Sequence, residues 1–255
     1  MGYDTYRYKL AAFVIAGAGV RVAKHGNRSI TSRCGSADLL EGLGVRIDLT
    51  PEQVATCIEA AGIGFMFAQK FHPAMRYVGP VRREIGIRTV FNVLGPLTNP
   101  ARARHQVLGV ASPTLAEKLA RALSRLDTVL ALVVHGHGGL DELGLSGPNV
   151  VYEVRAGQAP RRYEVSAEEL GLRPAPKEAV AGGDVARNVA IVRGVLSGDE
   201  RGAPRDIVLL NAAAALVAAE RAEDMREGLA LARASLEEGR ALERLERMVA
   251  ASQAQ

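Results

Sequence analysis

The sequence predicts an α/β fold: a mostly parallel sheet flanked by helices, with a separate small all-helical subdomain. Of its 255 residues, 48% are hydrophobic but only 4% are aromatic, which favours close helix–sheet layers built from small aliphatic side chains. Residues 105–135 alternate strand, helix and strand, as parallel strands with a helical crossover do. Residues 48–86 are helical and interrupt this pattern. We therefore assign 1–47 and 87–255 to one α/β domain, and 48–86 to the small helical subdomain.

The first elements are set by small apolar runs and by capping residues. The run AAFVIAGAGVRVA predicts a helix over Ala11–Ala16 and a buried strand over Arg21–Ala23, separated by a glycine-containing turn. Ser36 is the expected cap of a helix over Ala37–Leu43 that Gly44 closes. Thr50 and Pro51 are typical of the first two positions of a further helix, which we expect to reach Ala61.

The middle and C-terminal elements follow from periodicity and from Gly-Pro breaks. We expect strands at Ile63–Phe67, His105–Val110 and Thr128–His135, antiparallel additions at Asn149–Val154 and Arg161–Val165, helices at His72–Ile85 and Thr114–Leu126, and a short helix broken at Gly95-Pro96. From Gly182 the chain is predicted to be helical, with breaks near Gly198 to Pro204. The last helix is expected over about Ala222–Ala250. A surface helix that caps the domain is the favoured interpretation, and a coiled-coil helix that pairs with a partner is the alternative.

The charge, the cysteines and the absence of long apolar runs restrict the kinds of molecule that the chain is expected to bind. The net charge is +4, but the basic residues are interleaved with acidic ones, which indicates a mixed solvated surface and argues against a nucleic-acid partner. Cys34 and Cys57 form no C-x-x-C pair and cannot make a zinc site alone. No apolar run reaches the roughly 18 residues of a membrane span, and the first residues lack the order of a secretory signal. A cytoplasmic protein without a membrane partner is therefore expected.

The loop after the first predicted strand is the most informative feature. It leaves the strand end, where ligands of α/β folds bind, and offers two fixed positive charges, a glycine, three hydroxyls and a run of N–H groups. A phosphate or diphosphate site is one interpretation; a basic surface loop is the other. The loop comprises Lys24, His25, Gly26, Asn27, Arg28, Ser29, Ile30, Thr31 and Ser32.

Two further segments carry candidate ligand groups. Asp141-Glu142 lies in a glycine-rich loop after a strand, where adjacent carboxylates suit Mg²⁺, although a solvated acidic turn explains the same spacing. In the segment from His72 onward, Arg82 or Arg83 could hold a carboxylate in bidentate fashion, although a helix with an exposed basic face is the simpler alternative.

Taken in order, these segments resemble the anthranilate phosphoribosyltransferases. The resemblance rests on VAKHGNRSITSRCGSADLLEGLGV, FMFAQKFHPAMRYVGPVRREIGIRTVFNVLGPLTNPA and VVHGHGGLDEL, and it extends from Ala11 to the C-terminus. It implies the nucleoside phosphorylase/phosphoribosyltransferase-like fold, with residues 48–86 as the remainder of a small all-helical subdomain that is only partly present here. Pyrimidine nucleoside phosphorylases share that fold, but the KHGNR loop argues against an assignment to them.

The resemblance also implies an activity and a set of site residues. In the family, anthranilate displaces diphosphate from 5-phosphoribosyl 1-diphosphate, giving N-(5-phosphoribosyl)anthranilate in tryptophan biosynthesis. Carried over by position, Lys24 through Ser32 and Ser36 would line the phosphoribosyl diphosphate site, and Asn27 would also touch anthranilate. Arg82 would hold the anthranilate carboxylate with His72 nearby, and Asp141 and Glu142 would hold Mg²⁺. Lys24 and Arg82 are the residues expected to act in catalysis.

The start of the chain departs from the family pattern. The resemblance implies that several helices, a strand and a Gly-Thr-Gly-Gly-Asp loop precede this start, and that an Asn-x-Ser-Thr motif stands where this chain has Tyr6-Arg7-Tyr8-Lys9. We therefore expect an N-terminally truncated member, with an edge strand of the sheet missing, an incomplete surface for the family's homodimer and doubtful activity. The alternative is a non-catalytic remnant that binds a phosphorylated ligand or a partner chain.

Overall fold

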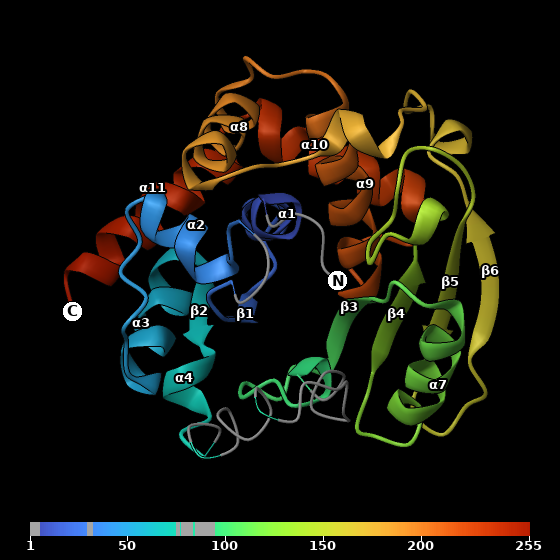
Figure 1. Cartoon of the computed structure of the whole chain (residues 1–255), viewed down its shortest axis with the longest axis horizontal. Coiled ribbons are helices and arrows are strands. Elements are labelled where there is room, and N and C mark those ends of the chain that lie inside the picture. Colours follow the sequence, from blue (N-terminus) through green and yellow to red (C-terminus); the bar gives the residue numbers. More distant parts are fainter. Residues whose placement is uncertain (1–5, 30–32, 75–76, 78–83, 85–94) are drawn as a thin grey trace.

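The computed structural model describes residues 6–29, 33–74, 77, 84 and 95–255, and it has the predicted α/β architecture (Figure 1). Its strands form two sheets among these residues, one of two strands and one of four. Helices α1 (Tyr6–Gly17), α9 (Ala203–Ala218) and α10 (Met225–Glu237) lie between and behind the sheets (Figure 1). Helices α3 (Pro51–Ala61) and α11 (Arg240–Gln253) cover the small sheet, and α7 (Pro113–Leu123) covers the large one.

The small sheet consists of β1 (Val22–Gly26) and β2 (Ile63–Phe67). The two strands are parallel, with Val22 opposite Ile63 and Gly26 opposite Phe67. Between them in sequence lie α2 (Ser36–Gly42) and α3 (Pro51–Ala61), and α4 (Ala68–Phe71) follows β2. Every residue of β2 is buried, because the neighbouring helices, α3 above all, pack against this strand.

The large sheet has the order β3-β4-β5-β6. Strands β3 (His105–Gly109) and β4 (Leu130–His135) are parallel and are joined through α7 (Pro113–Leu123). Strands β5 (Asn149–Val154) and β6 (Arg161–Val165) extend the sheet in the antiparallel sense, as the sequence predicts.

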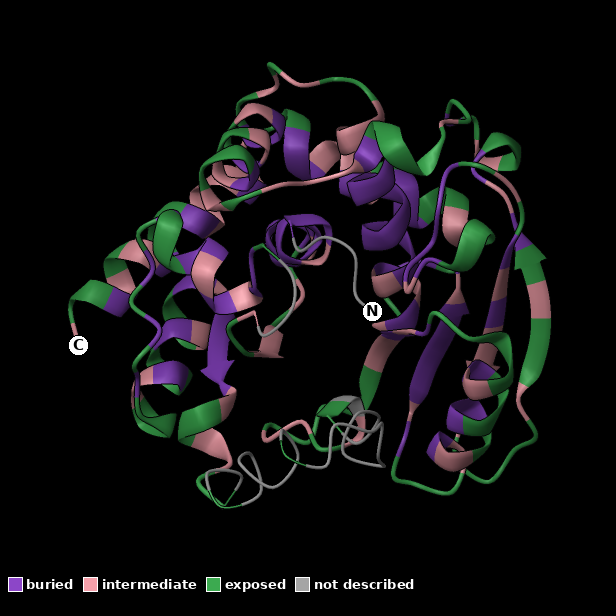
Figure 2. Ribbon diagram, in the orientation of Figure 1, coloured by how far each residue is buried: buried purple, intermediate pink, exposed green. Residues whose placement is uncertain are grey.

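The core is built around two helices with many alanines and few polar side chains. Helix α1 (Tyr6–Gly17) and helix α9 (Ala203–Ala218) are buried along most of their length, as Figure 2 shows for the centre of the molecule. Small side chains allow these helices to pack closely against each other and against the strands. Helices α8 (Val185–Ser197), α10 (Met225–Glu237) and α11 (Arg240–Gln253) surround this pair.

Several predicted boundaries are wrong for local reasons. Helix α1 begins at Tyr6 rather than Ala11, and β1 runs from Val22 to Gly26 rather than over Arg21–Ala23. Ser36 is the first helical residue of α2, and Gly35 is the cap, because the Asp38 carboxylate accepts the Gly35 N–H. The predicted last helix is two helices, α10 and α11, since Gly239 adopts a left-handed φ of 73° between them.

Some sequence-based assignments stay predictions. Most of the helix expected over His72–Ile85, with Arg82 and Arg83, lies outside the described residues, as do Ile30, Thr31 and Ser32. The division of the chain into 1–47 with 87–255 and 48–86 stays a prediction, as does the homodimer. None of the helices described is both long and apolar enough to cross a bilayer.

Candidate active site

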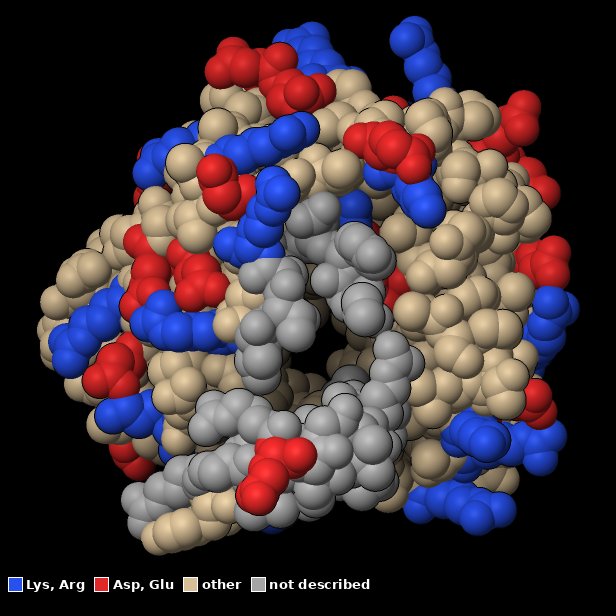
Figure 3. Space-filling model, viewed as in Figure 1, with Lys and Arg blue, Asp and Glu red and all other residues tan. Residues whose placement is uncertain are grey.

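The candidate site lies where the carboxyl ends of β1 and β3 approach each other. A cavity of about 710 Å³ separates these strands, and its lining includes Lys24, His25 and Gly109. Figure 3 shows a hollow opening near the centre of this face, between the part that carries β1 and β2 and the part that carries β3 to β6. Basic and acidic side chains are interspersed over the rest of this face (Figure 3).

Lys24 and His25 lie near the carboxyl end of β1, and both line this cavity. The Lys24 ammonium lies 5.6 Å from the centre of the Tyr8 ring, and burial lowers the pKa of Lys24. Gly26 follows, and a Cβ there would lie 2.9 Å from both the Phe65 ring and the Ser36 Cβ. Only glycine therefore lets the loop pass between β2 and the start of α2, and this contact brings Ser36 beside the end of β1.

The rest of the described loop is held by carboxylates of α2. Arg28 pairs with Asp38 and Glu41, and the Asp38 carboxylate also accepts the N–H groups of Ser29 and Gly35. Although burial acts to raise it, the pKa of Asp38 is lowered by these N–H groups and by Arg28. Arg28 thus faces α2 in this arrangement, and its side chain shapes the loop.

Two histidines from different elements meet beside Lys24. The rings of His25, in β1, and His72, directly after α4, pack edge to face with centres 4.9 Å apart. Burial, the neighbouring His72 and Lys24 lower the pKa of His25 to about 4, so its ring is neutral at pH 7. The Nε2 atoms of both rings are shielded from solvent and have no hydrogen-bond partner among the described residues, which leaves donors or acceptors for a ligand.

Asp141 and Glu142 approach this region from the other sheet. They lie in the loop between β4 and β5, and a Cβ at Gly109 would overlap the Asp141 carbonyl, so this loop passes directly over the end of β3. The Tyr8 hydroxyl, from α1, donates to the same carbonyl. We call the loop that follows β1 the β1 loop, and the loop between β4 and β5 that carries Asp141 and Glu142 the acidic loop. Because the Tyr8 ring also lies against Lys24, this one side chain links the β1 loop to the acidic loop.

Glu142 is buried against Arg7 of α1. Both side chains are almost inaccessible, and the Arg7 guanidinium contacts the Glu142 carboxyl and donates to the Val180 carbonyl. Burial raises the pKa of Glu142 to about 8, although Arg7 and Lys9 act to lower it. Burial and the neighbouring Lys24 likewise lower the pKa of Lys9 to about 7. Two basic side chains of α1, Arg7 and Lys9, therefore lie near Asp141 and Glu142.

This arrangement fits Mg²⁺ only in part. Asp141 offers the hard oxygen donor that Mg²⁺ prefers and forms no ion pair with another described residue. Glu142 is engaged by Arg7 and would have to be released to bind a cation. Within the described part of the chain, no group of three or more His, Cys, Asp or Glu side chains has the geometry of a metal site. Any ion here would need oxygens from the substrate to complete its shell.

Two buried asparagines, which the sequence analysis missed, fix the acidic loop. Asn149 is fully buried and makes five hydrogen bonds, to the backbones of His137, Gly144, Gly147 and Val165. Asn211 of α9 binds both the N–H and the carbonyl of Leu143. Asn211 is a lone polar residue in an apolar stretch of sequence, which was its only available signal. Asn149 directly follows Ser146-Gly147-Pro148, where an asparagine is an ordinary turn residue and gives no signal.

The described site residues therefore converge in part as the sequence predicts. Lys24, His25, Gly26, Ser36 and His72 lie together at the end of β1, and Asp141 reaches them through Tyr8. Asn27 and Arg28 lie on the exposed part of the loop, where the Asn27 side chain accepts the Arg28 N–H. Arg82, Ile30, Thr31 and Ser32 fall outside the described residues.

Comparison with known proteins adds a family to this geometry. The model of the family described as "Glycosyl transferase family, a/b domain" matches residues 9–242 of this chain. The anthranilate phosphoribosyltransferase of Roseiflexus castenholzii is 73% identical over 242 residues, which cover 95% of this chain and 71% of that protein. The corresponding protein of Thermomicrobium roseum is 60% identical over 256 aligned residues, which cover 99% and 73%.

Comparison with solved structures points to the same family. The anthranilate phosphoribosyltransferase of Thermus thermophilus superimposes with a TM-score of 0.92 at 50% identity, covering 99% of this chain and 74% of that one. The Saccharomyces cerevisiae enzyme in complex with PRPP and Mg superimposes with a TM-score of 0.88 at 28% identity, covering 100% and 71%. Because the matches span almost the whole chain at high identity, it belongs to the anthranilate phosphoribosyltransferase family.

Proposed function

We propose that this chain transfers the phosphoribosyl group of 5-phosphoribosyl 1-diphosphate to anthranilate, releasing N-(5-phosphoribosyl)anthranilate and diphosphate in tryptophan biosynthesis. The observation that carries the proposal is the junction at Tyr8, where the Lys24 end of β1 and the Asp141 loop meet beside one cavity. Family membership supplies the reaction class, and this junction supplies cationic groups and a carboxylate where a diphosphate would be held.

The substrate contacts follow the loop and the histidine pair. The phosphoribosyl diphosphate is proposed to lie along the end of β1, with anthranilate beside Asn27, His72 and Arg82. Arg82 would hold the anthranilate carboxylate in a bidentate contact. The diphosphate side of the site would comprise Lys24, His25, Gly26, Asn27, Arg28, Ser29, Ile30, Thr31, Ser32 and Ser36.

The reaction depends on electrostatic stabilisation of the leaving diphosphate and on alignment of the amine more than on a strong base. The amine nitrogen of anthranilate bonds to C1 of the ribose while the bond from C1 to the diphosphate oxygen breaks, and diphosphate leaves with the bonding electrons. The nitrogen then loses one proton to solvent water. C1 becomes positive and the leaving oxygen negative in the transition state, so a fixed cation beside that oxygen lowers the barrier. We assign this task to Lys24, and Arg82 would orient the amine.

Mg²⁺ would supply further positive charge to the departing diphosphate when it is bound. We assign its protein ligands to Asp141 and, after release from Arg7, to Glu142. This assignment predicts competition between Arg7 and the ion. Replacing Arg7 by Met should strengthen Mg²⁺ binding in the presence of diphosphate, as measured by calorimetry, and equal affinity in both proteins would contradict the role of Glu142.

The activity is tested by following the loss of anthranilate fluorescence with 5-phosphoribosyl 1-diphosphate and Mg²⁺. Lys24→Ala should lower kcat/KM by about 100-fold or more, the usual effect of removing one charge-stabilising group. The matched control is Lys118→Ala, which removes an exposed lysine of α7 and should leave the rate unchanged. Equal rates in both variants would rule out the role of Lys24.

The two arginines of the segment after His72 are separated by the same assay. Arg82→Ala should raise the KM for anthranilate, whereas Arg83→Ala should leave it close to that of the parent chain. The reverse result would move the carboxylate contact to Arg83. Full activity of a protein that carries both Asp141→Ala and Glu142→Ala would reject the metal assignment.

A further inference from the structure

The first turn of α1 carries a buried lysine that no acidic side chain pairs. Lys9 is only 7% exposed, and it forms no hydrogen bond or ion pair with any residue that the structure describes. Asp141 and Glu142 act on it electrostatically, but Glu142 is engaged by Arg7. Burying an ammonium group without a partner costs free energy, so lysines are almost never buried unless something pairs with them. Lys9 therefore has the properties of a group that awaits a ligand.

The neighbours of Lys9 locate its ammonium group within the candidate site. Its side chain and that of Lys24 line one small void, and the other residues around this void are apolar. The charged and titratable groups that act on Lys9 come from Lys24 at the end of β1, from Cys34 in the β1 loop, and from the acidic loop. The ammonium of Lys9 thus lies where β1, the β1 loop and the acidic loop approach one another.

The start of α1 adds positive potential to the same region. Lys9 is the fourth residue of this helix, whose first turn contains Arg7 and no acidic residue. The free N–H groups of a helix N-terminus carry a partial positive charge, which acidic side chains usually offset. Helical side chains lean toward the helix N-terminus, so a lysine here adds its charge to that end. The helix end and the buried ammonium therefore favour an anion together.

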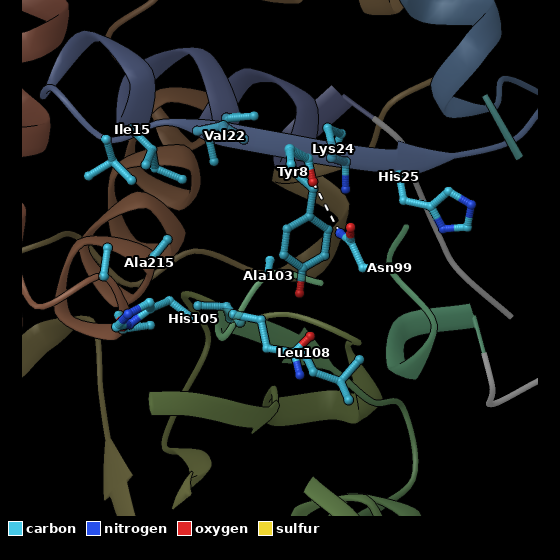
Figure 4. Close-up of a pocket in the computed structure, with 18 of the residues that line it drawn as sticks. Tyr8, Ile15, Val22, Lys24, His25, Asn99, Ala103, His105, Leu108 and Ala215 are labelled. Atoms are coloured by element: carbon cyan, nitrogen blue, oxygen red, sulfur yellow. Dashed lines mark hydrogen bonds between the residues drawn. The ribbon is translucent and has the colours of Figure 1, made fainter. Parts of the chain in front are cut away.

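Lys24 is a second cation without an acidic partner. Its ammonium lies over the Tyr8 ring and forms no ion pair with a described residue. Figure 4 shows Lys24 and Tyr8 next to each other, and both point from the side of β1 into the cavity. Burial and the nearby Lys24 lower the pKa of Lys9, as expected for two like charges that water does not separate. One anion that contacts both ammonium groups would offset their repulsion.

We propose that Lys9 and Lys24 together bind a diphosphate group, that of the phosphoribosyl donor in the proposed reaction, and that Lys9 is a binding residue supplied by α1. The inference deepens the proposed function and rests on it for the identity of the ligand. A diphosphate carries several negative charges on two phosphoryl groups, so that both ammonium groups can form charge-assisted hydrogen bonds with it at once. Two fixed charges of the chain would then hold the anion before a metal ion binds.

The binding test uses inorganic diphosphate as the probe and needs no turnover. Calorimetry in buffer that contains EDTA should detect binding to the parent chain. Lys9→Met keeps the length of the side chain and removes its charge, and it should weaken binding at least about tenfold, the usual effect of removing a hydrogen bond to a charged group. The matched control, Lys118→Met, removes an exposed lysine of α7 and should leave the affinity unchanged.

Urea unfolding separates a binding role of Lys9 from a structural one. Because Lys9 is buried without a partner, Lys9→Met should raise the urea concentration at which the ligand-free chain unfolds. Diphosphate should raise that concentration for the parent chain, since a ligand stabilises the state that binds it, and much less for the variant. A lysine kept for packing would instead give a variant that unfolds at a lower urea concentration with or without diphosphate.

A third measurement uses the parent chain alone. Acetic anhydride acetylates accessible amines, and mass spectrometry of the digested chain reports the extent at each lysine. Diphosphate in EDTA should slow the acetylation of Lys9 and Lys24 and leave that of Lys118 unchanged. Protection of Lys24 without Lys9 would reject the contact from α1.

Two further results would overturn the proposal: no binding of diphosphate by the parent chain, or equal affinity of the parent chain and Lys9→Met. Failure of the proposed function looks different. Diphosphate bound through Lys9 in a chain that never consumes anthranilate would support the lysine pair and reject the transfer reaction. Consumption of anthranilate with an unchanged KM for 5-phosphoribosyl 1-diphosphate in Lys9→Met would support the reaction and reject the role of Lys9.

Discussion

Two loops at the ends of parallel strands meet at the candidate site, and they are stabilised in opposite ways. The loop after β1 is held by the ion pairs of Arg28, whose side chain is 44% exposed. The loop between β4 and β5 is held from inside, by Asn149, Asn211 and the buried contact of Arg7 with Glu142. Exposed pairs can rearrange around a ligand at little cost, whereas a buried polar network fixes the backbone before a ligand arrives.

This difference indicates that the two loops have different roles in the site. The β1 loop carries the groups proposed to bind phosphates. Its Arg28 side chain can leave the carboxylates of α2 and bind a ligand instead. The acidic loop carries Asp141, and the fixed backbone around it sets the position of that carboxylate. Variants that disturb each loop should therefore differ in stability in a predictable order.

The largest expected effect is the removal of the buried arginine. Arg7→Ala should lower the free energy of unfolding by about 4 kcal/mol, because it removes the contact with Glu142 and the hydrogen bond to Val180 and leaves a cavity. Arg28→Ala, the matched change in the β1 loop, should cost no more than about 1 kcal/mol. Urea unfolding measures both, and similar losses in the two variants would erase the proposed contrast.

A smaller difference is expected between two asparagines. Asn149→Ala leaves several buried backbone groups of the acidic loop without partners and should cost about 3 kcal/mol. Asn27→Ala removes an exposed side chain that accepts only the adjacent Arg28 N–H and should change stability by less than about 0.5 kcal/mol. A stable, cooperatively unfolding Asn149→Ala protein would show that other contacts hold the acidic loop.

The smallest expected effects are opposite dependences of stability on pH. Burial raises the pKa of Glu142 from 4.5 to about 8, so the folded state retains a proton that the unfolded state releases, and this contribution to stability is lost as pH rises between these values. The pKa of His25 is lowered from 6.5 to about 4, again mainly by burial, so its contribution is lost as pH falls between these values.

Glu142→Gln should therefore remove a decline in stability toward high pH, and His25→Gln a decline toward low pH. Both are measured by urea unfolding in metal-free buffer across the two ranges. If Glu142→Gln leaves the high-pH slope unchanged, the carboxyl is not protonated in the folded chain, and the contact with Arg7 is a full ion pair.

Most of the regular elements could be predicted from the sequence because each has a local cause. Thr50 caps α3, Pro51 starts it and Gly62 ends it in a left-handed conformation, and all three act within a few residues. The antiparallel strands β5 and β6 were likewise evident. The single helix predicted at the C-terminus was wrong because the Arg, Glu, Leu and Ala pattern continues through Gly239, where the backbone turns.

The site was predictable as a list of residues and not as an arrangement. The motif around Lys24 and the pair Asp141-Glu142 were found from residue types in loops after strands. The partners of those residues were not, because Tyr8, Arg7 and Asn211 come from helices far away in the chain. Nothing in the stretch Tyr6-Arg7-Tyr8-Lys9 indicates that it packs against the acidic loop.

The sequence by itself determined the family, the kinds of groups in the site and the order of the elements, since motifs and periodicities are written in neighbouring residues. The tertiary structure alone decided that Glu142 faces Arg7, that Arg28 turns to α2, and that β1 and β3 lie on two sides of one cavity. These facts depend on burial and on contacts between distant segments. The free energy of a buried charge is set by what surrounds it in space and not by its neighbours in the chain.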